Sequence, residues 1–297
     1  MKGCILVNAY LNSKEYLYQA ERIRDELIAL DSAADIVPLG GMPVVVADGR
    51  IENALDGYDF YICWDKDKYV LSALERTGKR VFNSAAAIEA CDDKMLTYLA
   101  LANSGVPLVR TVPGLLCFDP LEKIAPETIG RLESLIPYPI VVKESYGSLG
   151  KGVRLAKNRD ELIAITEQVK CKPHLFQEFI DESRGRDLRV IVLGGKVLGG
   201  MLRDSGGKDF RSNIGAGGSG TACTPDEEQS AVAIKTAGIL GLDYCGVDLL
   251  LGKNGPIVCE VNSNAFFYSF ERVTGVNVAK AYARYVLDET AKRQRGK

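Results

Sequence analysis

Two carboxylates and one amide near the C-terminus are the residues of this chain best suited to chemistry. Glu260 and Asn262 lie two apart in the apolar segment 256–262, and Asp248 lies in the apolar segment before it, "GVDLLL". Residues two apart in a strand face the same way, and a turn at Asn254–Gly255 would bring Asp248 across from Glu260. These oxygen donors suit Mg²⁺ or Mn²⁺, which takes further ligands from water and phosphate. Because an unpaired buried carboxylate is costly, pairing with a nearby lysine or arginine is the alternative.

A glycine-rich loop and two lysines could bind the phosphates of a nucleotide. Residues 146–152, "YGSLGKG", lie between two predicted strands, and their glycines would let backbone N–H groups approach phosphate oxygens. The loop has neither the Walker A nor the GxGxxG pattern, so a simple turn is the alternative. Lys143 precedes the loop within an apolar strand, where an ammonium needs an anion. Lys94 could add a second positive charge, or could lie on a solvated helix face.

Planar donors occur in two further segments. Arg189 lies in "GRDLRVIV", and Arg203, Arg211 and Asn213 lie in "MLRDSGGKDFRSN". Such donors suit the negative charge of a transferring phosphoryl group or an oxyanion, with ordinary surface arginines as the alternative. The chain has one histidine, His174, which gives little support to Ser/His/Asp catalysis or to a polyhistidine metal site.

The composition argues against several classes of partner. The 297 residues include 37 Lys and Arg against 39 Asp and Glu, which gives no electrostatic case for nucleic acid or a membrane surface. No apolar run is long enough to span a bilayer. The eight cysteines form no CxxC pair and most lie in apolar segments, which favours reduced thiols in a cytoplasmic protein.

The elements that must position these residues fall into three predicted units. Residues 1–90 alternate between strand and helix signals, which predicts an α/β domain with a parallel sheet. Residues 91–180 begin with a helix opened by Asp92 and continue with the strands around the glycine-rich loop. Residues 181–297 contain two hairpins, and between them a helix that we expect Thr224 to cap. The last two units are therefore predicted to be α+β.

In this order the motifs resemble those of the ATP-grasp superfamily, and most of all its RimK-like branch of ATP-dependent glutamate ligases. The similarity covers nearly the whole chain. Its strongest segments are "DK" at 93–94, "VVKESYGSLGKGV" from 141, "QEFI" from 177, "GRDLRV" from 185, "DFRSN" from 209, "GVDLL" from 246 and "EVN" from 260. The resemblance implies an ATP-grasp fold, in which an N-terminal substrate domain precedes two subdomains that grip ATP.

The resemblance also implies a role for each matching residue. The nucleotide-binding residues would be Lys94, Lys143, Ser145, Gly147, Ser148, Gly150, Gln177, Glu178, Phe179, Ile180 and Asp187. Among these, the lysines would touch the phosphates, the glycine-rich loop would close over them, residues 177–180 would grip adenine and Asp187 would hold the ribose. Two Mg²⁺ or Mn²⁺ ions would bind to Asp248, Glu260 and Asn262. The γ-phosphate and an acyl phosphate would be steadied by Arg203, Arg211 and Asn213.

The implied activity is that of an ATP- and Mg²⁺-dependent carbon–nitrogen ligase. A carboxylate would attack the γ-phosphate, and an amine would then attack the acyl phosphate to give an amide or peptide bond. The expected partners are a carboxylate acceptor and an amine, with an amino acid such as glutamate added to a protein C-terminus or a small molecule. Assembly as a homo-oligomer is left open. The alternatives are a nucleotide-binding regulator of the same fold without turnover, and a small-molecule kinase.

Two segments depart from the family pattern. Many relatives have proline and glycine after "EVN", whereas this chain has the aromatic segment "SNAFFYSFERVTG" from Ser263. We expect this segment near the acceptor, so the acceptor is expected to differ from that of the ribosomal-protein ligase. The N-terminal unit matches least well, and Asn8, Tyr10 and Asn12 are its candidate substrate contacts.

Overall fold

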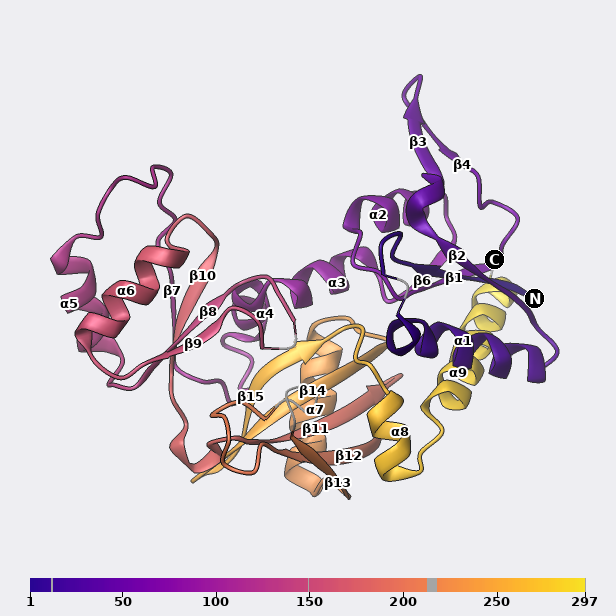
Figure 1. The fold of residues 1–297 in the computed structure, drawn as a ribbon. Helices are drawn as coiled ribbons and strands as arrows, with labels where there is room; N and C mark the ends of the chain where they lie inside the picture. The colour runs from indigo at the N-terminus through magenta and orange to yellow at the C-terminus, as the bar shows by residue number, and fades with distance from the viewer. Residues whose placement is uncertain (12, 149, 213–217, 297) are drawn as a thin grey trace.

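The computed structural model describes residues 1–11, 13–148, 150–212 and 218–296. Its helices and strands form three parts, which Figure 1 shows side by side. The N-terminal domain, with both chain termini beside it, lies at one end, the central part lies at the other, and the C-terminal sheet lies between and below them. This is the α/β organisation that the sequence predicts. Among the described residues, no helix has both the length and the apolar character needed to cross a membrane.

The N-terminal sheet has four parallel strands in the order β2-β1-β5-β6. These strands are β1 (Lys2–Val7), β2 (Ala33–Pro38), β5 (Phe60–Cys63) and β6 (Arg80–Phe82). Alternate side chains face opposite ways, and both faces of the sheet are apolar. Helix α1 (Lys14–Ala29) covers one face, and helices α2 (Lys68–Arg76) and α3 (Ala85–Asp92) cover the other. Coverage of both faces is typical of parallel sheets.

Two short elements in this domain were not predicted from the sequence. They are the 3₁₀ turn η1 (Leu39–Gly41) and a hairpin formed by β3 (Val44–Ala47) and β4 (Arg50–Asn53). The hairpin projects away from the sheet at the top of Figure 1. It takes no part in the site described below.

The central sheet is antiparallel, with strand order β7-β10-β8-β9. Its strands are β7 (Thr111–Pro113), β8 (Ile140–Glu144), β9 (Val153–Ala156) and β10 (His174–Glu178). Helices α5 (Pro126–Leu135) and α6 (Arg159–Val169) pack on one face. The other face is turned toward the C-terminal sheet, so side chains on alternate positions of β8 and β10 meet that sheet.

The helix predicted to open at Asp92 is two helices. Helix α3 ends at Asp92, and α4 (Lys94–Leu101) begins after Asp93. The Asp93 carboxylate accepts hydrogen bonds from the backbone N–H groups of Met95 and Leu96, so Asp93 is the N-cap. The sequence offered two adjacent acids at this point, and only the geometry shows which of them caps.

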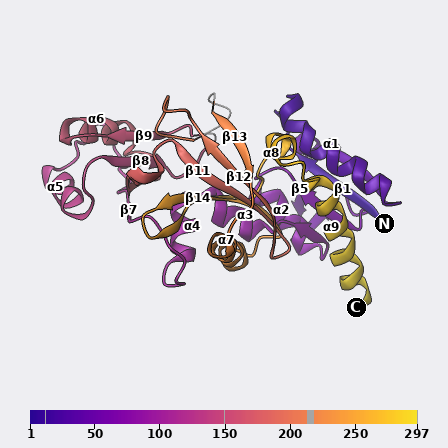
Figure 2. The same cartoon turned by 90° about the horizontal axis from the view of Figure 1, so that it is seen from below.

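The C-terminal sheet has five antiparallel strands in the order β13-β12-β11-β14-β15. They are β11 (Arg186–Leu193), β12 (Lys196–Asp204), β13 (Ser219–Cys223), β14 (Tyr244–Gly252) and β15 (Gly255–Asn262). Helix α7 (Glu227–Ile239) covers one face, as the view from below in Figure 2 shows. The turn η2 (Asp181–Ser183) precedes the sheet.

The cap predicted for α7 is also corrected. Asp226, not Thr224, is its N-cap. Asp226 accepts a hydrogen bond from the backbone of Gln229, whose side chain in turn accepts one from the backbone of Asp226. This reciprocal pair is a capping box, and it satisfies two backbone donors at the start of the helix.

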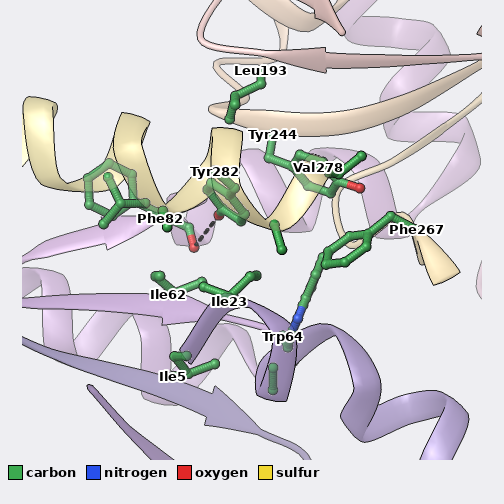
Figure 3. Packing of buried hydrophobic residues seen from close by; sticks show 14 of the residues in the cluster. Ile5, Ile23, Ile62, Trp64, Phe82, Leu193, Tyr244, Phe267, Val278 and Tyr282 are labelled. Atoms are coloured by element: carbon green, nitrogen blue, oxygen red, sulfur yellow. Dashed lines mark hydrogen bonds between the residues drawn. The ribbon is translucent and has the colours of Figure 1, made fainter. Parts of the chain in front are cut away.

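The C-terminal segment returns to the N-terminal domain. Helices α8 (Tyr268–Thr274) and α9 (Val278–Arg295) follow β15, and α9 packs beside α1. Figure 3 shows the core that results, with side chains from the first sheet, α1, β11, β14 and α9 in one cluster. Its labelled members are Ile5, Ile23, Ile62, Trp64, Phe82, Leu193, Tyr244, Phe267, Val278 and Tyr282. The N-terminal domain and the C-terminal sheet therefore share one apolar core.

Candidate nucleotide and metal site

A cavity of about 110 Å³ lies between the central sheet and the C-terminal sheet. The predicted site residues that line it are Lys143, Gly150, Gln177, Glu178, Phe179, Ile180, Asp187, Arg203, Arg211, Asp248 and Glu260. They come from strands β8, β10, β11, β12, β14 and β15 and from the segments that join these strands. The fold thus brings to one cavity the predicted adenine hinge, Lys143, which is predicted to bind phosphate, and the carboxylates of Asp248 and Glu260.

Strand β8 directs Lys143 into the cavity by simple alternation. Ile140 and Val142 pack beneath helices α5 and α6, whereas Val141 and Lys143 face the cavity. Lys143 is buried, and its Nζ lies 3.7 Å from the Sγ atom of Cys259. Within the described residues it makes no ion pair with a carboxylate. A buried ammonium in this position favours binding of an anion.

Cys259 is a wall residue of the cavity. Burial raises the pKa of its thiol above the ordinary value, although the nearby Lys143 ammonium opposes that rise. Because the thiolate is the reactive form, a raised pKa disfavours reaction of this side chain.

Lys94, at the start of α4, reaches the glycine-rich loop. Its Nζ donates a hydrogen bond of 2.8 Å to the carbonyl oxygen of Gly147 and lies 3.9 Å from Oε1 of Glu260. Burial lowers the pKa of the Lys94 ammonium; Glu260 opposes this shift and Lys143 adds to it. Only 7% of the residue is exposed, so the solvated helix face considered from the sequence is excluded.

The flap, residues 146–152 without the undescribed position 149, joins β8 to β9. Gly147, Gly150 and Gly152 have φ angles of 127°, 72° and 77°, which side chains with a Cβ rarely adopt. Nη1 of Arg211 donates a 2.7 Å hydrogen bond to the carbonyl oxygen of Gly150. Lys94 and Arg211, two cations predicted to bind phosphate, therefore hold backbone carbonyls of the flap. A triphosphate would have to replace these contacts.

The C-terminal hairpin brings its polar residues together as the sequence predicts. Asp248 lies across from Glu260, and Gly246 lies across from Asn262. The Nδ2 atom of Asn262 donates to Oδ2 of Asp248 at 3.4 Å. A β-bulge follows Asp248, since its neighbour Leu249 pairs with Val258 and leaves Cys259 as the extra residue.

Two arginines neutralise Asp248. Nε and Nη2 of Arg189 donate to its Oδ1 and Oδ2 at 2.8 and 2.7 Å. Nη2 of Arg203 lies 2.8 Å from the same Oδ2 atom. Arg203 also grips Asp187, with Nε donating to Oδ1 at 2.6 Å, and the hydroxyl of Ser212 donates to Oδ2 of Asp187. The floor of the cavity is thus a network of alternating charges from β11, β12 and β14.

The network fixes the charge of its members. Burial alone would raise the pKa of the Asp248 carboxyl, but Arg189 and Arg203 bring it below the ordinary value. Burial likewise favours the neutral form of Arg203, yet Asp248 and Asp187 raise its pKa above the ordinary value. Asp248 is therefore an ionised oxygen donor at neutral pH, whichever cation it binds.

The donor set fits a hard dication only in part. Two carboxylates and an amide oxygen are the ligand types that Mg²⁺ prefers. Among the described residues, however, no group of three or more His, Cys, Asp or Glu side chains could hold a metal by itself. Asp248 is paired with two arginines, and such pairing is the alternative to a metal site that the sequence leaves open. An ion bound here would need ligands from phosphate or water, as a nucleotide-bound Mg²⁺ has.

The predicted adenine hinge, residues 177–180, begins with the last two residues of β10. The Gln177 side chain is buried and donates to Oγ1 of Thr111 at 2.9 Å, so it supports the strand. Phe179 pairs edge to face with Phe210, with ring centroids 6.2 Å apart, and it stacks against the guanidinium of Arg184. An apolar wall of this kind suits a flat base.

Other predicted site residues lie at the margin of the cavity or beyond the described chain. Ser145 is buried, and its carbonyl oxygen accepts from the backbone N–H of Lys94. Ser148 is exposed on the flap. Asn262 does not line the cavity but contacts Asp248 from the side. Asn213 lies outside the described residues.

Several residues of the cavity wall were missed by sequence reasoning. Among them are Val109, Leu250, Phe210 and Ser212. Leu250 could have been found, because it is two residues from Asp248 on β14 and so shares its face. The other three lie outside regular strands, where no periodic signal exists.

The predicted substrate contacts occupy the carboxyl end of the N-terminal sheet. Nδ2 of Asn8 donates to the Asp65 carboxylate at 3.3 Å, and Nδ2 of Asn264 donates to the Asp65 carbonyl at 3.2 Å. Ligands of open parallel sheets bind at this end of the strands. Tyr10 is 90% exposed, and Asn12 lies outside the described residues.

The aromatic segment after Asn262 is only partly available to a substrate. Phe267 and Phe270 are fully buried in the shared core. Phe266 and Tyr268 are partly exposed and pack edge to face on Tyr16 and Tyr18 of helix α1. Phe267 and Phe270 are therefore structural, whereas Phe266 and Tyr268 have exposed surface that a substrate could contact.

The chain has the ATP-grasp fold. Residues 91–286 match the family model described as the RimK-like ATP-grasp domain, and the chain belongs to that family. The match includes every residue of the cavity described above.

Curated relatives are more than a third identical to this chain over the aligned residues. It is 37% identical over 235 residues to N-acetylaspartylglutamate synthase A of Homo sapiens, covering 78% of this chain and 59% of that protein. It is 39% identical to beta-citrylglutamate synthase B of Homo sapiens, covering 74% and 56%. A probable alpha-L-glutamate ligase of Maridesulfovibrio salexigens is 36% identical, with 73% and 70% covered. The chain thus spans little more than half the length of the two human proteins.

Solved structures resemble the fold over almost the whole chain. The D-alanine–D-alanine ligase of Bacillus anthracis, complexed with ATP, superposes with a TM-score of 0.74 at 15% identity and covers 100% of this chain and 99% of that one. The ATP-grasp ligase PsnB, complexed with a minimal precursor, Mg and ADP, gives 0.70 at 18% identity, with 97% of each chain covered. At such low identity these likenesses concern the fold.

Proposed function

We propose that this protein is an ATP- and Mg²⁺-dependent ligase that joins a carboxylate to an amine. The observation that carries the proposal is the cavity in which Lys143, the hinge at the end of β10 and the carboxylates Asp248 and Glu260 come together. A nucleotide with its base at the hinge would direct its phosphates toward the lysines and the hairpin. Family membership and the three relatives named as glutamate ligases or synthases support the same activity.

In the proposed reaction, a substrate carboxylate attacks the γ-phosphate of ATP, releasing ADP and forming an acyl phosphate. An amine then attacks the acyl carbon and displaces inorganic phosphate, leaving an amide. Lys94, Lys143 and Arg211 would bind the phosphates, and Arg203 would face the transferred group. One or two Mg²⁺ or Mn²⁺ ions, held by Asp248, Glu260 and Asn262, would neutralise charge on the transferred phosphoryl group.

The flap would exclude water from the acyl phosphate, which otherwise hydrolyses. Lys94 and Arg211 now hold two of its carbonyl oxygens, so it would release these contacts to admit the nucleotide and then close over it. The three predicted units, residues 1–90, 91–180 and 181–297, would then act as substrate domain, flap-bearing subdomain and metal-bearing subdomain.

The acceptor side of the site favours an amino acid as one substrate. Asp65 accepts hydrogen bonds from Asn8 and Asn264 at the carboxyl end of the first sheet. Asn264 lies two residues after Asn262 in the sequence. Relatives whose names contain citrylglutamate and acetylaspartylglutamate suggest glutamate as the amine and a small acid as its partner. A kinase would leave a phosphorylated product instead, and a regulator would bind ATP without turnover.

The test is to supply ATP, Mg²⁺ and pools of small carboxylic acids with glutamate or other amino acids. We expect ADP and phosphate in equal amounts, together with a product whose mass equals acid plus amine less water. The Glu260→Gln variant should lose this turnover while retaining its fold, because its side chain is 30% exposed and makes only a 3.9 Å ion pair. A product carrying phosphate, or full turnover in the variant, would refute the ligase proposal.

A further inference from the structure

Arg189 grips the carboxylate that is proposed to bind the metal. It lies directly across from Asp248 on the neighbouring strand, and its Nε and Nη2 atoms donate to both carboxylate oxygens at 2.8 and 2.7 Å. A dication would use these same oxygens. The side chain pair is largely buried, with 15% of Arg189 and 5% of Asp248 exposed.

No acceptor position remains on one oxygen of Asp248. Its Oδ2 atom receives Nη2 of Arg189, Nη2 of Arg203 and Nδ2 of Asn262, at 2.7, 2.8 and 3.4 Å. A carboxylate offers about four lone-pair sites over its two oxygens, so these contacts leave little room for a further ligand. Two guanidinium charges would also repel a dication at ligand distance. Oδ1 receives only Nε of Arg189, so a metal that binds Asp248 competes most directly with this guanidinium group.

Arg189 is the group that can move. Arg203 has a second carboxylate partner in Asp187 and is 6% exposed, which fixes it in place. Arg189 has no second carboxylate partner among the described residues, and its more exposed side chain has more freedom. Once released, its guanidinium needs another anion. Arg189 does not itself line the cavity, but its partner Asp248 does, and a triphosphate that enters with the metal supplies an anion there.

We propose that Arg189 is an exchangeable counter-ion of the metal site. It neutralises Asp248 until a metal–triphosphate complex enters; then the dication takes the carboxylate and Arg189 takes a phosphate oxygen. The inference rests on the proposed function and deepens it. It follows that the dication has low affinity for the site without the triphosphate, so that metal and nucleotide bind as a coupled pair.

The test measures binding of Mn²⁺ alone by the loss of its free electron paramagnetic resonance signal, without nucleotide. Arg189→Met removes the competing charge and leaves Asp248 paired with Arg203. We expect this variant to bind Mn²⁺ at least about tenfold more tightly than the unmodified protein. Arg284→Met, which removes an exposed arginine of helix α9, is the matched control and should leave Mn²⁺ affinity unchanged.

Equal Mn²⁺ affinity of Arg189→Met and the unmodified protein would overturn the exchange. So would unmodified protein that binds Mn²⁺ as tightly alone as it does with a non-hydrolysable ATP analogue, a result that requires no variant to fold. If the unmodified protein binds neither the analogue nor its Mn²⁺ complex, the proposed function itself fails. The readout is metal occupancy, so the two failures are distinguishable.

Discussion

Two hairpins meet across the cavity, and they are held in opposite ways. The β14–β15 hairpin carries the buried Asp248, whose carboxylate is held by a bidentate Arg189 from the neighbouring strand β11 and by Arg203 from β12. The β8–β9 hairpin ends in an exposed glycine loop, which two single hydrogen bonds from Lys94 and Arg211 hold over the cavity. From this difference we propose a division of labour, in which the first hairpin is the fixed part of the site and the second is the part that moves.

The comparison predicts that breaking the arginine lock mainly affects stability. Asp248→Ala would leave Arg189 unpaired and Arg203 with one partner fewer, in a buried setting. We expect a loss of about 3–5 kcal/mol in the free energy of unfolding, measured by denaturant titration. Glu260→Ala on the same hairpin is the control and should change it by about 1 kcal/mol or less, since its one ion pair is long and partly exposed. Equal effects of the two variants would mean that the lock is not structural.

On the opposite wall of the cavity, a change at Lys143 is expected to alter nucleotide affinity and not stability. Lys143→Met should weaken binding of an Mg²⁺–ATP analogue by about 1.5–3 kcal/mol, because a charge-assisted contact to phosphate is lost. This corresponds to about tenfold to hundredfold in the dissociation constant, measurable by isothermal titration calorimetry. Lys157→Met, an exposed lysine beyond β9, should leave the affinity unchanged. An unchanged affinity in Lys143→Met would remove this lysine from the phosphate site.

The smallest effect is expected in the flap backbone. Gly152 has a φ angle of 77°, and a Cβ there would lie 3.1 Å from the Glu144 side chain. Gly152→Ala should therefore destabilise the protein by about 1–2 kcal/mol in thermal unfolding. Gly130→Ala, within helix α5 and with open space around it, should instead stabilise it by about 0.5–1 kcal/mol. If both variants shift the melting temperature in the same direction, the left-handed backbone conformation at position 152 is not the reason that glycine is needed there.

Much of this site could be predicted because strands impose a period of two. That period alone places Lys143 on the face opposite the helix-facing Val142 and puts Glu260 and Asn262 on one face. The turn at 253–255 by itself would set Asp248 across from Cys259, and the bulge moves it across from Glu260. The parallel sheet of residues 2–82 followed from alternating strand and helix signals. The family resemblance supplied the roles, which neither spacing nor composition could give.

The remainder depends on contacts between distant segments. No local signal shows that Arg189 lies across from Asp248, because the two are on different hairpins. Nor does the sequence reveal the bulge at Cys259, or that Phe267 joins a core shared with the N-terminal domain. Which of two adjacent acids, Asp92 or Asp93, caps a helix depends on backbone angles, and either residue could adopt the angles of a cap.

The most direct test concerns the dication itself. Mn²⁺ binding in the presence of a non-hydrolysable ATP analogue should be measured for the unmodified protein and for Glu260→Gln, which keeps the shape of the side chain and removes its charge. If Asp248, Glu260 and Asn262 hold a triphosphate-bound metal, the variant should bind Mn²⁺ at least about tenfold more weakly. Equal Mn²⁺ affinity in the two proteins would show that the C-terminal hairpin is not the metal site.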